Sequence, residues 1–452
     1  MKAPLFFERR FLPLWAAFSL SAFNDNVLRQ ALIIGIGYGA IPIAGFNDPK
    51  NAIPFVGGLF SAATLACTSI AGQVAEKYET AMLIRRLKFA EFILMALAAL
   101  GFLLDNGLFL ATVFVAMSAQ LAFFSPVRVA ALPKYLYADE LIRGNAYCNA
   151  GMFIAVVAGL VLGGILMPLP LGWVAISAIL LSAAATSGLG VLAQPPAPPD
   201  APQLKIDWNP FGQTIRIMAF AFAEPGVWRP LAGVAVFYVV STLTTILVPL
   251  YAIEELGANG AAATTIMGIF AVGAGFGAIV SATLSKRRSG LGFSCLGIGA
   301  AGAMTFGLYW LTSTVAATGA SATVGQLLGH APGRLLLAGF FLSSAFTGLY
   351  LVPLQAAAQR RAPSATRARI MAAGNLLNAL CSMFGSLCVL IITATPLRPA
   401  TGFLIISVTE FGVALYMIAR WFALPQGAYD DSLAAGARER AISESAPRDR
   451  AA

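Results

Sequence analysis

Long apolar segments follow one another along almost the whole chain, and each is about as long as the hydrocarbon core of a membrane is thick. A helix that crosses this core needs about 20 mainly apolar residues, and stretches such as FILMALAALGFLL at residues 92–104 are of this kind. Prolines, glycines and charge clusters separate the segments. They predict twelve membrane-spanning helices, at about residues 11–38, 53–75, 86–104, 107–125, 146–167, 171–193, 229–252, 262–284, 291–313, 334–354, 371–394 and 397–421.

The composition excludes a water-soluble protein. Of the 452 residues, 58% are hydrophobic and 11% are charged, whereas a soluble domain carries roughly a quarter charged residues. Five cysteines at irregular spacing and a single histidine form neither a disulfide framework nor a zinc-binding motif. We therefore predict an all-α membrane protein that needs no metal ion or cofactor.

Lysine and arginine fall almost entirely into alternate gaps between the predicted spans. Of the 29 basic residues, 25 lie in one set of gaps and in the terminal segments; the exceptions are Lys50, Arg334 and Arg398 in the other set and Arg29 within the first span. Because basic loops stay in the cytoplasm, this asymmetry supports the number of spans and predicts that both termini are cytoplasmic. It also accounts for the net charge of +9 without a nucleic-acid partner, which would need a basic face on a soluble module.

The predicted spans form two groups of six. Residues 1–193 hold the first six and residues 229–421 hold the second six. The proline-rich residues 194–228 link the two groups, and their second half is predicted to form an amphipathic helix at the membrane surface. The charged residues 422–452 are predicted to form a disordered cytoplasmic tail.

Sequence matches between the two groups indicate a duplication. SPVRVAALPKYLYADELIRGNA after the fourth span resembles LVPLQAAAQRRAPSATRARIMAAGN after the tenth, with Pro126 matching Pro353 and Gly144 matching Gly374. Twelve helices in two repeated halves resemble the plan of the major facilitator transporters. That plan places the solute at the membrane midplane, between the halves.

One polar stretch, SAFNDNVLRQ at residues 21–30, interrupts the first span, and Asp25 in it is expected roughly 20 Å from the start of the helix. An isolated charge at this depth costs about 2.5–3.5 kcal/mol, so its polar groups are expected to face the interior of the bundle. The i, i+4 spacing of Asp25 and Arg29 favours an intrahelical ion pair that merely stabilises the fold. The functional alternative is a substrate site in the central cavity, where Asp25 meets an ammonium group and Arg29 a phosphate. The candidate residues in this stretch are Asn24, Asp25, Asn26 and Arg29.

Other charged residues stand within or beside apolar spans. Arg128 follows Pro126 at the predicted cytoplasmic end of the fourth span, and it is either an ordinary loop charge or a residue at the cavity mouth that receives a phosphate. Glu91 in the third span is expected to snorkel beside Lys88. Glu410 lies in the middle of the twelfth span without an evident partner.

AGQVAEKYETAMLIRR at residues 71–86 resembles the signature turn of major facilitator proteins, in which a glycine precedes an acid, a base and an arginine cluster. The resemblance implies that Gly72 lets the second and eleventh helices approach closely, and that Glu76 and Lys77 form ion pairs that break when the cytoplasmic side opens. The alternative is ordinary topogenic charge in a short loop.

Elsewhere, glycines at helical spacing predict tight helix crossings: Gly35 with Gly39, Gly159 with Gly163, and Gly273 with Gly277.

Several motifs together resemble the lysophospholipid transporter family of the major facilitator superfamily. They are FLPLWAAFSLSAFNDNVLRQAL, AGQVAEKYETAMLIRRLKFAE, AFFSPVRVAALPKYLYADELIRGNA and GLVLGGIL. The resemblance covers the N-terminal half well and the C-terminal half more loosely. It implies a flippase of the bacterial inner membrane that moves lysophospholipids, especially lysophosphatidylethanolamine, for reacylation by an acyltransferase on a separate chain. It also implies that Asp25, flanked by Asn24 and Asn26, and Arg128 contact the substrate.

Two positions depart from the pattern of that family. Asn149 stands where relatives usually have a glutamate. In the seventh helix, where some relatives carry an arginine, VVSTLTTILVPLY offers hydroxyl groups instead: Ser241, Thr242, Thr244 and Thr245. Phosphate recognition is therefore expected to rest on Arg29 or Arg128, unless the headgroup preference has changed.

The sequence favours transport of a single-chain, zwitterionic phospholipid by alternating access between the two halves. Polar contacts must select such a substrate, because burying its tail in the protein only exchanges one apolar medium for another. The alternative is efflux of amphipathic or cationic small molecules, with Asp25 binding the positive centre. An enzyme such as a membrane acyltransferase is disfavoured. The only histidine of this chain, His330, lies in a predicted outer loop. The sequence that follows it, HAPGRL, lacks the aspartate that would orient a catalytic base in such an enzyme.

Overall fold

The computed structural model describes residues 5–423 apart from 44, 47, 138–139, 210–211, 213–214, 217, 220–221, 223–225, 285–290, 316–322, 362–366 and 396. Twelve long helices fill this part of the chain, one for each predicted span. The predicted amphipathic helix of the linker lies largely outside the described residues, and so does the predicted tail from residue 424 onward.

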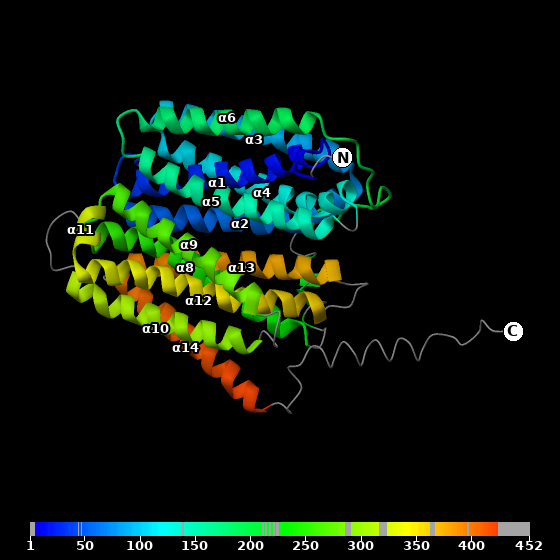
Figure 1. The fold of residues 1–452 in the computed structure, drawn as a ribbon. Helices are drawn as coiled ribbons and strands as arrows, with labels where there is room; N and C mark the ends of the chain where they lie inside the picture. Colours follow the sequence, from blue (N-terminus) through cyan, green and yellow to red (C-terminus); the bar gives the residue numbers. More distant parts are fainter. Residues whose placement is uncertain are drawn as a thin grey trace.

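The first six long helices form one bundle and the last six form a second bundle beside it (Figure 1). The first bundle consists of α1 (Leu12–Gly37), α2 (Pro49–Lys77), α3 (Thr80–Leu103), α4 (Gly107–Tyr135), α5 (Leu141–Leu166) and α6 (Gly172–Leu192). The second consists of α8 (Trp228–Glu254), α9 (Gly260–Leu284), α10 (Leu291–Val315), α12 (Ala331–Arg361), α13 (Arg367–Ala394) and α14 (Pro399–Ala423). Two short helices precede α1 and α12: η1 (Leu5–Phe7) and α11 (Val324–Gly329).

Helix α1 begins and α14 ends at the same end of the molecule, at the right in Figure 1. We call this end the terminal face and the opposite end the distal face. Helices alternate in direction, so α2, α4 and α12 end at the terminal face, whereas α8 and α10 begin there.

The packing pattern repeats between the bundles. In the first, α1 packs on α5, α2 on α4, and α3 on α6; in the second, the corresponding pairs are α8 on α13, α9 on α12, and α10 on α14. Two equivalent contacts join the bundles, α5 with α9 and α2 with α13. The two halves are therefore related structural repeats, with α1 and α8 facing each other across their interface.

Ten of the described helices are long and apolar enough to cross a membrane. The other two long helices, α1 and α3, contain the most polar side chains of the predicted spans: the stretch at residues 21–30 in α1, and Arg86, Lys88 and Glu91 in α3. These two helices are also the ones whose polar groups bond to each other inside the first bundle.

Glycines set two of the closest helix contacts. A Cβ added to Gly159 or Gly163 on α5 would overlap the backbone of α1, and one added to Gly277 on α9 would overlap the backbone of α12 at Ala345. The predicted crossings at Gly159 with Gly163 and at Gly273 with Gly277 are thus confirmed. The third prediction is wrong, because Gly35 faces the side chain of Ile41 and Gly39 lies in a turn with φ of 72°.

Helix α4 runs to Tyr135, well past the predicted end of the fourth span at residue 125. Pro126 and Pro133 lie inside it. The apolar segment marks only the part of the helix that crosses the hydrocarbon core, whereas the helix itself continues beyond it. Its start is fixed by Asn106, whose side chain accepts a hydrogen bond of 3.0 Å from the Phe109 amide.

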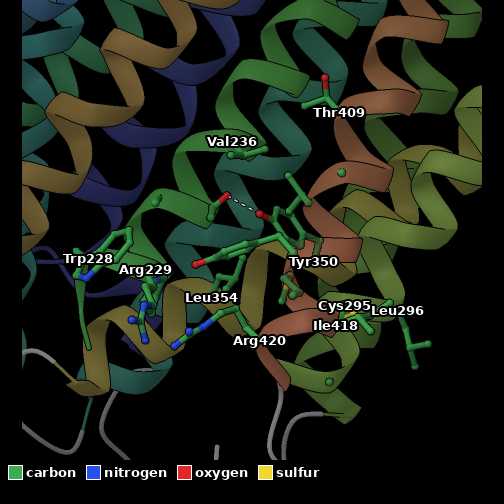
Figure 2. Close-up of a pocket in the computed structure, with 18 of the residues that line it drawn as sticks. Trp228, Arg229, Val236, Cys295, Leu296, Tyr350, Leu354, Thr409, Ile418 and Arg420 are labelled. Carbon is green, nitrogen blue, oxygen red and sulfur yellow. Dashed lines mark hydrogen bonds between the residues drawn. The ribbon is translucent and has the colours of Figure 1, made fainter. Parts of the chain in front are cut away.

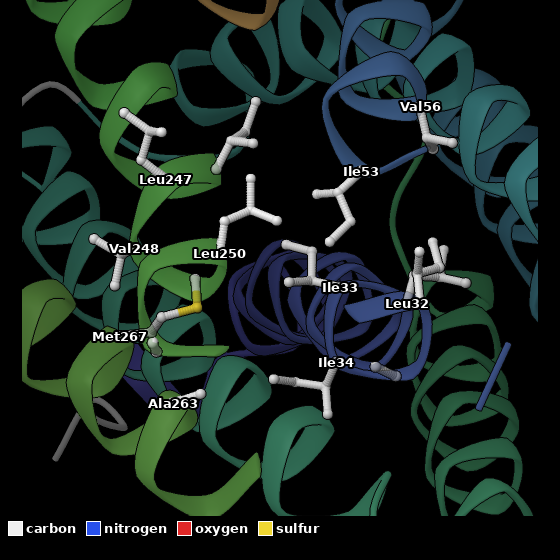
Figure 3. Close-up of a cluster of buried hydrophobic side chains, with 14 of the residues drawn as sticks. Leu32, Ile33, Ile34, Ile53, Val56, Leu247, Val248, Leu250, Ala263 and Met267 are labelled. Carbon is white, nitrogen blue, oxygen red and sulfur yellow. The ribbon is translucent and has the colours of Figure 1, made fainter. Parts of the chain in front are cut away.

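An apolar cluster closes the distal part of the interface between the bundles (Figure 3). It joins α1 and α2 to α8 and α9 through Leu32, Ile33, Ile34, Ile53, Val56, Leu247, Val248, Leu250, Ala263 and Met267. A hydrogen bond from the Tyr38 hydroxyl to the Ala258 carbonyl also links the bundles on this side. Near the distal face, the described side chains that join the two bundles are therefore mainly apolar.

In each bundle, an ion pair connects residues near the ends of two helices. At the terminal face, Arg10 donates to both carboxylate oxygens of Glu140 at 2.8 and 2.7 Å, which ties the start of α1 to the start of α5. The Glu140 carboxylate holds the pKa of Arg10 above its ordinary value. At the distal face, Arg398 before α14 bonds to Glu255 after α8, and this carboxylate likewise raises the pKa of Arg398.

Candidate functional site

The polar stretch of α1 divides between two sides of the helix. Ser21 and Asn24 point into the first bundle, toward α3 and α6. Asn26, Arg29 and Gln30 line a cavity at the interface between the bundles. The helix thus serves two different environments within about two and a half turns.

A fully buried polar cluster occupies the first of these environments. Lys88 forms an ion pair of 2.9 Å with Glu91, one turn away on α3. Lys88 also donates to the Ala17 carbonyl at 2.6 Å, and Glu91 accepts from Ser21 Oγ at 2.5 Å and from Asn24 Nδ2 at 3.2 Å. Neither charged group snorkels to the surface as predicted: Lys88 is 0% exposed and Glu91 is 1% exposed.

This cluster has a structural role. Desolvating a charged pair is costly unless further hydrogen bonds satisfy both partners, and here α1 supplies them from Ala17, Ser21 and Asn24. Asn24 is fully buried and also donates to the Leu180 carbonyl of α6 at 3.3 Å. Asn24 therefore joins α1, α3 and α6, and it does not line the cavity.

The cavity on the other side of α1 has a volume of about 190 Å³. Its polar wall comes from α1 and α8, with Asn26, Arg29, Gln30, Thr244 and Thr245. Its apolar wall comes mainly from α5 and α9, with Val156, Leu160, Met267, Phe270, Ala271 and Ala274. The cavity is therefore amphipathic, and both bundles contribute to it.

Arg29 is held at the polar end of this cavity by an aromatic ring. Its guanidinium carbon lies 5.1 Å from the centre of the Phe60 ring on α2, within the range of a cation–π contact. Phe60 in turn stacks on Phe114 of α4, with ring centres 4.7 Å apart. The ring contact fixes the side chain without using its N–H groups, which remain available to an anion.

The other polar groups of the cavity are oriented by local hydrogen bonds. Asn26 donates to the Ala22 carbonyl at 2.7 Å, so its amide oxygen remains an acceptor. Thr244 and Thr245 donate to carbonyls one turn back, at 2.8 and 2.7 Å. Their hydroxyl oxygens can still accept hydrogen bonds. Gln30 donates to Met267 Sδ at 3.2 Å across the interface between the bundles.

Asp25 lies between the two environments and is 5% exposed. Within the described part of the chain, its carboxylate makes neither a hydrogen bond nor an ion pair, so the intrahelical pair with Arg29 that the spacing favours is not formed. The charged groups within electrostatic range are the anion Glu91 and the cations Arg29, Lys88 and Arg128. Asp25 is thus a buried carboxylate in a cationic environment, with no dedicated partner among the described residues.

Arg128 lies inside α4, since this helix continues to Tyr135, and not in a loop at its end. Its guanidinium donates to Met152 Sδ on α5 at 3.0 Å. The side chain is half-buried and lies within electrostatic range of Asp25. The structure thereby brings Asp25, Arg29 and Arg128 into one electrostatic neighbourhood, although only Arg29 lines the cavity.

The predicted gating residues lie at the terminal end of α2. The Glu76 carbonyl accepts hydrogen bonds from the Asp200 and Ala201 amides of the linker, and Lys77 lies over the Tyr78 ring at 5.8 Å. A Cβ added to Gly72 would meet no atom of the described residues within 4 Å, so the described parts of α2 and α13 are not in close contact at this point. Their close approach at Gly72, and ion pairs of Glu76 or Lys77, remain predictions for a different conformation.

Three features of this site were not assigned from the sequence. The first is the hydrogen bond between Gln30 and Met267 at the cavity wall. The second is the contact by which Phe60 positions Arg29. The third is the buried ion pair of Lys88 and Glu91, which stabilises α1 and does not reach the surface. The i, i+3 spacing of opposite charges in the third span was the available signal for the last of these. Asn149 is exposed on α5 and Glu410 is fully buried in the second bundle; neither lines the cavity.

Comparison with known proteins identifies the architecture. Residues 14–331 match the sequence profile described as the Major Facilitator Superfamily. The chain belongs to the major facilitator superfamily. It is accordingly a multi-pass membrane protein and a secondary transporter of the major facilitator type. Among curated proteins, none matches the sequence.

Solved structures of several transporters share this fold. A D-xylose-proton symporter is similar with a TM-score of 0.68 and 12% identity, over 93% of this chain and 99% of that chain. A POT family transporter in complex with a thioalcohol conjugated peptide has a TM-score of 0.66 and 16% identity, over 92% and 97% of the two chains. The nucleoside transporter NupG has a TM-score of 0.64 and 12% identity, over 90% and 99%. The predicted major facilitator fold is confirmed, and at these identities the likeness concerns the fold alone.

Proposed function

We propose that this major facilitator protein is a flippase for lysophospholipids, of which lysophosphatidylethanolamine is the model substrate. The observation that carries the proposal is the amphipathic cavity between the bundles, with an arginine at its polar end and apolar side chains of α5 and α9 opposite. A substrate for such a cavity has an anionic group next to a hydrophobic tail.

The size of the cavity supports binding of a headgroup rather than of a whole lipid. Sites that enclose a small molecule usually measure about 300–1,000 Å³, and this cavity measures about 190 Å³. A lysolipid would therefore place its phosphate at Arg29 and its glycerol near Asn26 and Thr244, while the tail leaves along Leu160 and Phe270. The tail gains little by this, because it moves from lipid to an equally apolar surface.

Asp25 supplies the second half of the recognition in this proposal. Its carboxylate lies one residue before Asn26 on α1 and within electrostatic range of Arg29. An ammonium group of the headgroup would provide the partner that the described residues do not offer. Arg128, on the terminal side of Asp25, would meet the phosphate on its way to or from the terminal face.

The proposed location is the bacterial inner membrane, with the terminal face and both chain ends in the cytoplasm. The positive-inside rule supports this orientation, since basic residues gather at helix ends on the terminal face. The apolar packing at the distal face and the open surroundings of Gly72 favour a state that is accessible from the cytoplasm. A separate acyltransferase on the cytoplasmic side would then consume the transported lysolipid.

Substitution of Asp25 by asparagine tests this function. The change keeps the shape and removes the charge, so we expect the folded amount to remain the same while lysophosphatidylethanolamine uptake is lost. Uptake of the labelled lipid is measured in cells that lack their own carrier, with and without a proton uncoupler, and the amount of folded protein is measured in parallel. Normal uptake by Asp25→Asn would remove the headgroup role of this residue.

Efflux of amphipathic or cationic small molecules is the second candidate, since Asp25 is a buried carboxylate within electrostatic range of Arg29, which lines the cavity. Competition separates the two functions. If excess unlabelled lysolipid leaves the uptake signal unchanged and cationic drugs displace it, the efflux function is correct and the lipid function is wrong.

A further inference from the structure

A second and larger cavity lies entirely within the second bundle. It measures about 890 Å³ and is bounded by α8, α10, α12 and α14 (Figure 2). None of the described residues that line it also lines the central cavity. In Figure 1 the last turns of α14 diverge from the rest of the bundle toward the terminal face, and the cavity lies beside this divergence.

The depth of this cavity matches one leaflet of a membrane. It extends along α14 from Thr409 to Arg420, which is about 16 Å at 1.5 Å per residue. This is about half of a hydrocarbon core of roughly 30 Å. The side chains along this length are mainly apolar, and they include Val236, Leu296 and Leu354.

The terminal end of the same cavity is basic. Arg229 of α8, Arg361 of α12 and Arg420 of α14 all line it, and no acidic residue is among the described residues of its wall. Figure 2 shows Arg229 and Arg420 together at this end, with Thr409 and Val236 at the other. Trp228 lies beside them, its ring 5.4 Å from the Arg229 guanidinium, as is usual for an aromatic residue at the membrane–water boundary.

These features fit one occupant better than any other. A polar ligand would leave the apolar length unfilled, and a hydrocarbon without a headgroup would place no anion beside Arg229 and Arg420. Arg361, which donates to the Gly226 carbonyl at 3.4 Å, adds its positive charge to the same end. Basic pockets between transmembrane helices on the cytoplasmic side suit anionic lipid headgroups. We propose that this pocket holds an anionic phospholipid of the adjacent leaflet, with its phosphate at Arg229, Arg361 and Arg420 and one acyl chain along α14.

This lipid is a resident partner and is distinct from the transported substrate. It would fill the space beside α14 and add to the apolar contacts of Val413, Ala414 and Met417, which already pack α14 against side chains of α8 and α12. The proposal concerns binding alone, so it does not depend on what the central cavity transports.

Two kinds of substitution separate the headgroup end from the acyl end. Arg229→Gln and Arg420→Gln each remove one basic group. Gly412→Phe fills the acyl part, because a Cβ at Gly412 meets no atom of the described residues within 4 Å and Gly412 lines the cavity. The matched controls are Arg143→Gln, which removes an exposed charge from the start of α5, and Gly188→Phe, which enlarges an equally open glycine on α6.

The experiment measures how much phosphatidylglycerol and how much phosphatidylethanolamine the purified full-length protein retains in detergent, by native mass spectrometry during a lipid titration. We expect wild-type protein to prefer phosphatidylglycerol. Each arginine variant is expected to weaken its retention about fivefold, and the double variant about 25-fold, since a basic group near a membrane contributes about a factor of five. Gly412→Phe is expected to lower retention of both lipids, and both controls to behave as wild type.

Two results would overturn the proposal. One is a wild-type protein that retains both lipids equally; the other is a double arginine variant whose phosphatidylglycerol retention stays within twofold of wild type. Thermal unfolding of each variant shows whether it is folded. If Gly412→Phe does not fold, the smaller Gly412→Leu takes its place, and unchanged retention by a folded variant counts against the acyl site.

Discussion

Replacing Arg29 with glutamine examines the central cavity most directly. The substitution removes the only charged group of the described residues that line this cavity, and it also removes the contact with Phe60. Hydrogen bonds to a charged group contribute about 1.5–3 kcal/mol each, and 1.4 kcal/mol corresponds to a factor of ten in affinity. We therefore expect the half-saturating concentration of lysophosphatidylethanolamine to rise about 10- to 100-fold.

The Arg29→Lys variant refines this expectation. It keeps the positive charge but replaces the planar fork that can hold two phosphate oxygens and stack on Phe60. Its half-saturating concentration is expected to lie between those of wild type and Arg29→Gln. A charge effect alone would leave the lysine variant close to wild type, so the intermediate value reports the geometry of the guanidinium.

The assay is the initial rate of translocation of a fluorescent lysophosphatidylethanolamine in proteoliposomes, measured over a range of lipid concentrations. A second amphiphile with the same tail and an amine but no phosphate is measured alongside it. The control variant Arg143→Gln has the same change of charge at an exposed position outside the cavity. Folded protein in each preparation is quantified by thermal unfolding, so that rates are compared per folded molecule.

The interpretation of Arg29 as a phosphate ligand is refuted by either of two results. In the first, Arg29→Gln transports the lysolipid with the concentration dependence of wild type. In the second, it impairs the phosphate-free amphiphile as strongly as the lysolipid, which would show that Arg29 supports the cavity wall and does not contact the phosphate.

Two further predictions concern the packing around the site. Glu91→Gln leaves Lys88 buried without its counter-ion, so we expect the unfolding free energy, measured by denaturation in detergent, to fall by about 3–5 kcal/mol. A double variant with Lys88→Met and Glu91→Leu should recover most of this loss. A Glu91→Gln variant as stable as wild type would contradict a structural role of the pair. Gly163→Leu places a side chain on the Val27 backbone and is expected to abolish folded protein, whereas Gly72→Leu should fold normally and slow transport, because the terminal ends of the bundles can no longer close. Folded yield and transport rate check both glycine variants, and wild-type transport by Gly72→Leu would mean that the helices never meet at this point.

The sequence was sufficient for the number and order of the spans because the width of the hydrocarbon core imposes their length. It was not sufficient for the ends of helices such as α4, which continues through two prolines into the boundary region. Within the site, the polar stretch of α1 predicted that these groups face the protein interior. It did not predict which of them point into the first bundle and which line the cavity between the bundles. Asn24 and Asn26 differ by two positions and therefore lie on different sides of the helix, one bonded to Glu91 and the other lining the cavity.

Other parts of the site depend on tertiary packing that no local pattern records. Phe60 reaches Arg29 only because α2 and α1 are neighbours in the bundle. The basic pocket beside α14 combines three arginines whose charges, taken along the chain, indicate only which side of the membrane they occupy. The three arginines come together because α8 begins at the terminal face, where α12 and α14 end. This arrangement is a property of the repeat architecture.

The cluster around Lys88 and Glu91 has a consequence for how the protein is made. Released alone into lipid, the third helix would carry a charged pair that is unfavourable at the centre of a bilayer by about 2.5–3.5 kcal/mol for each group. The hydroxyl, amide and carbonyl groups that satisfy the pair belong to α1, which leaves the ribosome earlier. Biogenesis should therefore keep α1 close to the insertion machinery until α3 emerges, so that the two helices pass into the bilayer as a partnered unit.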